Sequence, residues 1–153
     1  VLGTKTRCHT RSLSLHGAKG RSIRASKRDH HLDGRYGSDS AEIAALIAND
    51  PSLSGPLVDG LPYLRAEAVY AVTHEMATSI DDILSRRTRA RLLNRRASVT
   101  AARATAELIS PLLGWDDAQS SASIADFVDA CAREDAAAMV TEQEFIDSHK
   151  GQQ

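Results

Sequence analysis

The chain has 153 residues, which is enough for one domain of ordinary size. Hydrophobic residues make up 42% of the sequence and aromatic residues only 4%, so the core would be built mainly from Ala, Leu, Ile and Val, which suits packed helices better than a β-sandwich. No window approaches 18 apolar residues, and residues 1–30 lack the apolar stretch of a signal peptide, so we expect neither a transmembrane helix nor a signal peptide.

The net charge of −1 conceals an uneven distribution of charge along the chain. Residues 1–36 contain nine Lys and Arg against two Asp, a net +7, whereas residues 37–153 contain ten against eighteen Asp and Glu, a net −8. We therefore expect a poorly structured basic N-terminal arm over residues 1–36, an all-α domain over residues 37–140 and a polar tail over residues 141–153. The arm could dock on the acidic domain, on another domain or on a polyanion.

Helical signals begin directly after the arm. Ser38-Asp39-Ser40 offers N-cap residues, and an apolar stripe follows at Ile43, Leu46 and Ile47 with spacing i, i+3, i+4. Pro51 predicts the end of this helix, because proline cannot continue a helix and disfavours the helical conformation in the residue before it.

Five Pro and Gly residues then predict a loop over residues 51–62. A second helix is expected over residues 63–77. Its apolar face would consist of Ala66, Val69, Tyr70, Val72, Thr73 and Met76.

A short third helix is expected after Thr78. Ser79 and Asp82 have the spacing of a capping box, with Asp in the place of the usual Glu or Gln. Asp81 and Asp82 would lie in the first turn and Arg86 and Arg87 near the last turn, where the helix dipole favours negative and positive charge respectively.

Two longer helices complete the predicted fold. An Ala-rich helix is expected over residues 96–110, with Pro111 ending or kinking it, Gly114 closing the last turn and Trp115 folding back onto the apolar surface. A last helix is expected over residues 116–138. The prediction is therefore a small all-α bundle of four to five helices joined by short loops.

Few motifs in the chain point to chemistry. There is no glycine-rich dinucleotide fingerprint, no P-loop, and no C-x-x-C or H-E-x-x-H pattern. Cys8 and Cys131 are far apart and have no spacing motif, which favours free thiols over a disulfide. His74 next to Glu75 could act as an acid and a base, but nothing around the pair indicates a cleft. We therefore predict no catalytic, cofactor-binding or metal-binding residue.

The most unusual local feature is a cluster of arginines. Six fall within eleven residues: Arg86, Arg87, Arg89, Arg91, Arg95 and Arg96. They could bind nucleic acid or a substrate phosphate, or form ion pairs with carboxylates of the same domain. We favour ion pairs, because the cluster has no interleaved aromatic residues and the surrounding domain is acidic.

The segment over residues 67–89 carries a fairly specific pattern, E-x-x-Y-A-V-x-x-E-x-A followed by D-D-x-L-x-R-R-T-R. It resembles the C-terminal helical domain of FAD-dependent glycerol-3-phosphate dehydrogenases. Leu113-Gly114-Trp115 is similar to an L-G-W of that family, and residues 10–18 resemble the linker that leaves its FAD domain. The resemblance covers most of residues 1–117, and the first residue is Val rather than Met, so we expect an upstream FAD domain that this chain lacks.

The resemblance implies the function of the whole enzyme. The family oxidises glycerol 3-phosphate to dihydroxyacetone phosphate, passing hydride to FAD and electrons onward to a membrane quinone, or to oxygen in its oxidase branch. It implies that FAD is bound by the full-length enzyme and not by this fragment, which alone would be inactive. The implied partner is the upstream FAD and substrate domain, in a dimeric enzyme peripheral to the cytoplasmic face of the plasma membrane, with no nucleic acid.

The matching charged residues are interpreted as a structural motif of ion pairing and docking: Glu67, Glu75, Asp81, Asp82, Arg86, Arg87 and Arg89. The hypothesis is that the three arginines pair with the four carboxylates, fix the helix crossing and dock the domain on its FAD partner. The alternative is a stand-alone helical interaction module whose basic arm binds nucleic acid or an acidic partner. Salt-dependent binding of DNA would indicate that alternative.

Overall fold

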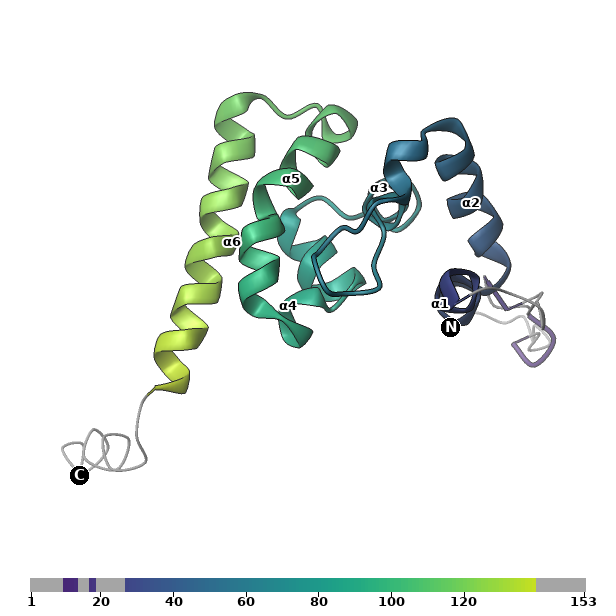
Figure 1. The fold of residues 1–153 in the computed structure, drawn as a ribbon, viewed down its shortest axis with the longest axis horizontal. Coiled ribbons are helices and arrows are strands. Elements are labelled where there is room, and N and C mark those ends of the chain that lie inside the picture. The colour runs from purple at the N-terminus through teal and green to yellow at the C-terminus, as the bar shows by residue number, and fades with distance from the viewer. Residues whose placement is uncertain (1–9, 14–16, 19–26, 140–153) are drawn as a thin grey trace, which may run out of the picture. The chain divides into compact units, whose positions relative to one another are not determined.

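A computed structural model describes residues 10–13, 17–18 and 27–139 (Figure 1). The helical elements follow one another in the order α1 (Lys27–Tyr36), η1 (Gly37–Asp39), α2 (Ser40–Asn49), η2 (Pro51–Ser54), α3 (Arg65–His74), η3 (Asp82–Arg87), α4 (Ala90–Leu93), α5 (Arg95–Leu113) and α6 (Asp117–Ala138). Within the described residues the only β pairing is one isolated bridge between Pro56 and Leu64, so the predicted all-α class is confirmed. Cys8, most of the predicted arm and the tail over residues 141–153 lie outside the described residues.

The chain divides into two compact units, Val1–Asn49 and Asp50–Gln153. In the first unit, residues 27–36 form α1, although we expected them to belong to a poorly structured arm. Leu32 and Tyr36 lie one turn apart on this helix and are 5% and 8% exposed, and α1 packs against α2. Burial of two apolar side chains thus stabilises a helix whose many charges obscured its period in the sequence.

The end of α2 agrees with the prediction. The helix ends at Asn49, and Asp50 takes an extended conformation in front of Pro51. The Asp50 carboxylate accepts a hydrogen bond from the Ser52 N–H at 2.9 Å and so caps η2, the first turn of the second unit.

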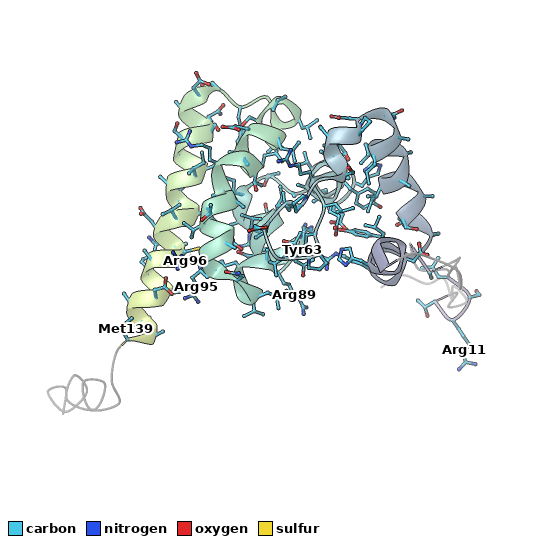
Figure 2. All side chains as sticks on the ribbon, in the orientation of Figure 1. Arg11, Tyr63, Arg89, Arg95, Arg96 and Met139 are labelled. Atoms are coloured by element: carbon cyan, nitrogen blue, oxygen red, sulfur yellow. The ribbon has the colours of Figure 1, made fainter. Side chains whose placement is uncertain are left out.

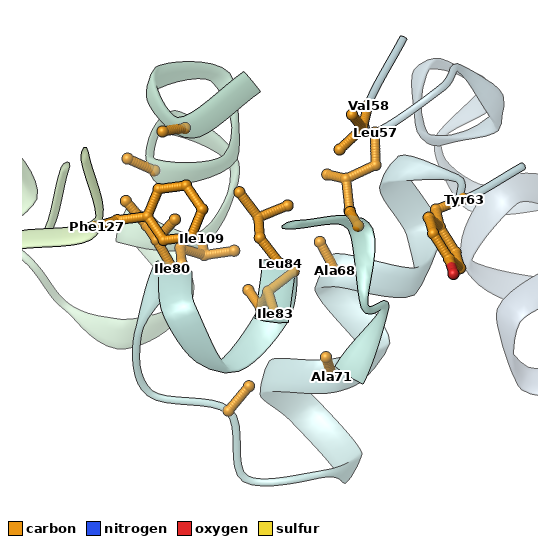
Figure 3. Packing of buried hydrophobic residues seen from close by; sticks show 14 of the residues in the cluster. Leu57, Val58, Tyr63, Ala68, Ala71, Ile80, Ile83, Leu84, Ile109 and Phe127 are labelled. Atoms are coloured by element: carbon orange, nitrogen blue, oxygen red, sulfur yellow. The ribbon is translucent and has the colours of Figure 1, made fainter. Parts of the chain in front are cut away.

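Helix α5 lies at the centre of the second unit and packs against α3, α4 and α6. The core contains the following buried residues: Leu57, Val58, Tyr63, Ala68, Ala71, Ala77, Ile80, Ile83, Leu84, Ala90, Ala102, Ala106, Ile109, Phe127 and Cys131. Figure 3 shows Phe127, the large side chain that α6 contributes, next to Ile80 and Ile109. Burial raises the pKa of the Cys131 thiol, so this group stays neutral and acts as a small apolar residue.

Helix α3 is shorter than the predicted helix over residues 63–77. It ends at His74, and Met76 adopts a left-handed conformation with φ of 55°. The Ala77 N–H then donates to the Ala71 carbonyl at 2.9 Å, six residues back, so the chain folds over the end of the helix at Met76. Met76, which we predicted on the apolar face, is therefore 84% exposed; that prediction was wrong because the chain reverses before it.

The junction between α5 and α6 follows the predicted chemistry, with one correction. Pro111 does not end α5, which continues to Leu113. The helix ends at Gly114, which has a φ of 67°. Pro111 lies in the last turn of the helix, where its missing N–H removes one backbone hydrogen bond without ending the helix. Trp115 packs against the core as expected.

Candidate functional site: an arginine and carboxylate network

The predicted ion-pair motif includes the capping box at the start of η3, and one of the two hydrogen bonds of this box is displaced by one residue. Ser79 Oγ accepts a hydrogen bond from the Asp82 N–H at 3.0 Å, as a capping box requires. The Asp82 carboxylate, however, accepts from the Thr78 N–H at 3.0 Å. Burial acts to raise the pKa of Asp82, but hydrogen bonds with Thr78 and Ser79 and the charge of Arg86 outweigh it, so the pKa is lowered overall.

The turns after this cap are a π-helix rather than an α-helix. The Thr88 N–H donates to the Ile83 carbonyl at 2.9 Å, five residues back, and the fully buried Thr88 hydroxyl donates to the same carbonyl at 2.8 Å. Arg89 then takes a left-handed conformation with φ of 59° and leads into α4. This backbone sends the arginines of the R-R-T-R run in different directions.

Arg86 forms the most exposed ion pairs of the motif. Its Nη1 lies 2.9 Å from Asp81 Oδ2 and 2.7 Å from Asp82 Oδ1, and its side chain is 58% exposed. A surface pair of this kind contributes only about 0–1 kcal/mol, because solvent screens the charges.

Arg87 connects two elements that are twelve residues apart. Its Nη2 donates to the Glu75 carbonyl oxygen at 2.7 Å, and its Nε lies 3.7 Å from Glu75 Oε2. The carbonyl belongs to the cap of α3, so one side chain ties the end of α3 to the end of η3. The structure thus brings Arg87 and Glu75 together.

Glu67 and Arg89 lie apart from these pairs. Glu67 is fully buried, and its carboxylate accepts a hydrogen bond from the Leu64 N–H at 2.8 Å, which caps the first turn of α3. Arg89 is exposed and has no ion-pair partner among the described residues. The seven-residue motif is therefore divided between two ion-pair groups, a helix cap and one exposed cation.

The most buried arginine of the cluster is Arg91, which the motif omitted. Its side chain is 12% exposed, and its Nη1 lies 2.9 Å from Asp81 Oδ1 while its Nη2 bonds to Glu134. The guanidinium also lies over the Phe127 ring, 5.7 Å from its centroid. Arg91 therefore joins the start of η3 to the last turns of α6.

Arg95 completes this second half of the network. It lies 3.2 Å from Glu134 Oε2 and forms a close ion pair with Asp135. These partners are about forty residues away along the chain, so helix periodicity did not reveal them. One signal was available in the sequence: two acidic residues near the C-terminal end of a helix oppose its dipole, which indicates cationic partners.

Two hollows lie beside the network in the second unit. One of about 390 Å³ is lined by Pro56, Leu57, Asp59, Asn94, Arg96, Ala97, Thr100 and Ala101. The other, of about 200 Å³, is lined by Ser85, Arg91, Leu92, Arg95 and Glu134. His74 lines neither hollow; its ring stacks on Tyr70 at 4.5 Å.

Two further findings hold for the described residues. They contain no group of three or more His, Cys, Asp or Glu side chains that could hold a metal ion. In the same part of the chain, no helix is long and apolar enough to cross a membrane. The observed arrangement is a small helical domain in which ion pairs of Arg87, Arg91 and Arg95 join α3, η3, α4, α5 and α6.

Comparison with known proteins identifies the family of this helical domain. Residues 8–120 match the family described as the C-terminal domain of alpha-glycerophosphate oxidase, so the chain belongs to that family. It is 34% identical over 132 residues to "Glycerol-3-phosphate dehydrogenase 2" of Mycobacterium tuberculosis, a match that covers 78% of this chain and 23% of the relative. It is 41% identical over 88 residues to "Glycerol-3-phosphate dehydrogenase" of Mycobacterium leprae, covering 58% and 15%.

A similar protein also occurs outside the mycobacteria. "Probable glycerol-3-phosphate dehydrogenase, mitochondrial" of Dictyostelium discoideum is 37% identical over 87 residues, covering 57% of this chain and 14% of the relative. The chain thus spans less than a quarter of the length of these relatives. No solved structure matches the chain.

Proposed function

We propose that this chain is the C-terminal accessory domain of an FAD-dependent glycerol-3-phosphate dehydrogenase. The whole enzyme would oxidise glycerol 3-phosphate to dihydroxyacetone phosphate and pass electrons from FAD to a quinone. The observation that carries the proposal is the family match over residues 8–120, together with the names of the relatives.

The site geometry supports a structural rather than a chemical role for this domain. The ion pairs of Arg87, Arg91 and Arg95 connect α3, η3, α4, α5 and α6 to one another. Such pairs set the positions of helices, and the carboxylates that they engage are not directed at a shared reaction centre. Catalytic groups would belong to the portion of the relatives that this chain does not cover.

The described residues do not fit the FAD cofactor. A dinucleotide-binding fold of this class needs parallel strands and a glycine-rich turn at the start of a helix. The described residues contain one isolated bridge and no strand, and the sequence contains no such turn. FAD would therefore be held by the remainder of the enzyme, and this domain would pack against that flavin-binding portion.

The quaternary context is part of the same proposal. The whole enzyme would be a dimer that lies peripherally on the cytoplasmic face of the plasma membrane, where a quinone is accessible to the flavin.

The test uses the Mycobacterium tuberculosis relative, shortened by the segment that matches this chain. The shortened protein would be mixed with the 153-residue chain, and co-elution and oxidation of glycerol 3-phosphate with a dye acceptor would be measured. We expect a complex and a gain of activity or thermal stability, with an unrelated helical protein as the control. A shortened protein that is fully active and does not bind the chain would refute the accessory role.

A further inference from the structure

The last turns of α6 carry no buried side chain. Cys131 is the last buried residue of this helix, and residues 132–139 are all exposed. Figure 2 shows Met139, which is 81% exposed, at the far end of the helix. Apolar packing therefore stabilises α6 only as far as Cys131, and the two turns that follow depend on other interactions.

Ion pairs connect these two turns to the rest of the second unit. Glu134 bridges two arginines, since its Oε1 bonds to Arg91 Nη2 and its Oε2 lies 3.2 Å from Arg95 Nη2. Asp135 forms a further ion pair with Arg95. Arg91 lies in α4 and Arg95 is the first residue of α5, so two carboxylates tie the end of α6 to two other elements. Within the part of the chain that the structure describes, no other hydrogen bond or ion pair links residues 132–139 to another element.

The charges of this helix end do not stabilise it by themselves. The last turn of α6 has no basic residue, and Glu134 and Asp135 lie near the C-terminal end, where the helix dipole disfavours negative charge. Residues 136–138 are alanines, which have the highest helix propensity, but two turns without tertiary contacts are only marginally helical in water. The ion pairs with the two arginines therefore decide whether these turns stay in place.

We propose that residues 132–139 form a latch that is held closed by charge and opens without unfolding of the core. Glu134 and Asp135 are the moving contacts of this latch. Arg91 and Arg95 are its fixed contacts, because α4 and α5 pack against each other. The latch needs neither a flavin-binding portion nor a ligand, so it is independent of the proposed function.

The exposure of the two carboxylates makes the latch sensitive to ionic strength. The side chains of Glu134 and Asp135 are 52% and 63% exposed, so dissolved ions reach both of them. The Debye length falls from about 10 Å at 0.1 M salt to about 3 Å at 1 M, which weakens exposed ion pairs much more than apolar packing. Added salt should therefore increase the opening of residues 132–139 and leave the helix before Cys131 closed.

The alternative is a helix end that frays for lack of contacts, whatever its charges are. The two explanations predict opposite effects when the carboxylates are removed. If these charges only oppose the helix dipole, Glu134→Gln with Asp135→Asn strengthens the helix end and reduces its opening. If they hold the latch, the same double variant increases its opening.

The experiment measures amide hydrogen exchange of the 153-residue chain, residue by residue by NMR, at about 0.05 M and about 1 M NaCl. The variants are this double variant and, separately, Arg95→Gln. The matched controls are Asp126→Asn with Asp129→Asn, which removes two exposed carboxylates of the same helix, and Arg103→Gln, which removes an exposed arginine of α5. These three control residues form no ion pair among the described residues.

We expect the opening of residues 132–139 in the unchanged chain to rise about fivefold between the two salt concentrations, while residues 118–131 stay within about twofold. At low salt, the double variant should increase this opening about five- to tenfold and Arg95→Gln about threefold, with both controls within about twofold of the unchanged chain. The salt response should also disappear in the double variant, because no ion pair remains to be screened.

Reduced or unchanged opening in the double variant would overturn the latch, because the carboxylates would then act only on the dipole. A salt response spread evenly over α6 would overturn it as well, since the helix would then open together with the core. Arg95→Gln keeps the test decisive if the double variant does not fold. Opening of this variant at the level of Arg103→Gln would likewise exclude a latch held by charge.

Discussion

Replacement of Arg91 by Ala should destabilise the second unit more than replacement of any other arginine in the cluster. Arg91 is 12% exposed and contacts Asp81, Glu134 and the Phe127 ring at once. The substitution would remove all three contacts and leave a void between α4 and α6. The expected result is a clear loss of thermal stability with the fold retained.

The size of the stability loss on Arg91→Ala follows from the exposure of its partners Asp81 and Glu134. Loss of hydrogen bonds to charged groups costs about 1.5–3 kcal/mol, and a cation–π contact adds about 0.5–1 kcal/mol. Asp81 and Glu134 are 30% and 52% exposed, so water can solvate them once Arg91 is gone, and the larger cost of a stranded buried charge does not apply. We expect a loss of about 2–3 kcal/mol, or about 8–12 °C in Tm for a unit of this size.

The assay is thermal and urea unfolding followed by circular dichroism at pH 7. Arg86→Ala is the matched control, because Arg86 is 58% exposed and its removal should cost about 0–1 kcal/mol. Arg91→Met keeps the packing of the aliphatic stem and isolates the contribution of the charge. The reasoning would be refuted if Arg91→Ala lowered Tm no more than Arg86→Ala.

Three further variants test other parts of the network and core. Arg87→Ala should lower the free energy of unfolding by about 1–2 kcal/mol, because the tie to the Glu75 carbonyl is lost; an unchanged Tm would contradict this role. Phe127→Ala should cost about 3–5 kcal/mol in urea unfolding, since its ring is 2% exposed in the core; a loss below about 1 kcal/mol would show that α6 does not close the core. The lowered pKa of Asp82 stabilises the fold above the ordinary carboxylate pKa of 3.8, and this contribution is lost as pH falls through the lower folded value. The stability gap between the unchanged chain and Asp82→Asn should therefore shrink below about pH 4, and a gap that is constant from pH 7 to pH 2.5 would refute the assignment.

Much of the fold could be predicted because the sequence and the local structure agree. The stop at Pro51, the cap at Ser79, the closing Gly114 and the extent of α6 all depend on residues within one turn of the feature they control. The family was also identifiable, since its pattern lies within residues 67–89. Local signals of this kind need no knowledge of the tertiary structure.

Other features escaped prediction for a physical reason. Helix α1 depends on burial of Leu32 and Tyr36, and this burial cannot be predicted from a segment in which most residues are charged or polar. The π-helix η3 depends on the buried Thr88 hydroxyl, whose bond to Ile83 is visible only once the core is assembled. In each case packing outweighed a weak or ambiguous local preference.

The sequence by itself predicted a small helical domain and its family, and it favoured ion pairs with carboxylates as the role of the arginine cluster. The tertiary structure decided which arginine meets which carboxylate. The ion pair of Arg91 with Glu134 joins residues that are 43 positions apart, and the distance between them depends on how α4 and α6 each pack against α5. The same packing decided that Arg89 is exposed, as are Leu92 and Leu93. Side chains of neighbouring residues point in different directions, so the sequence alone does not show which of them face solvent.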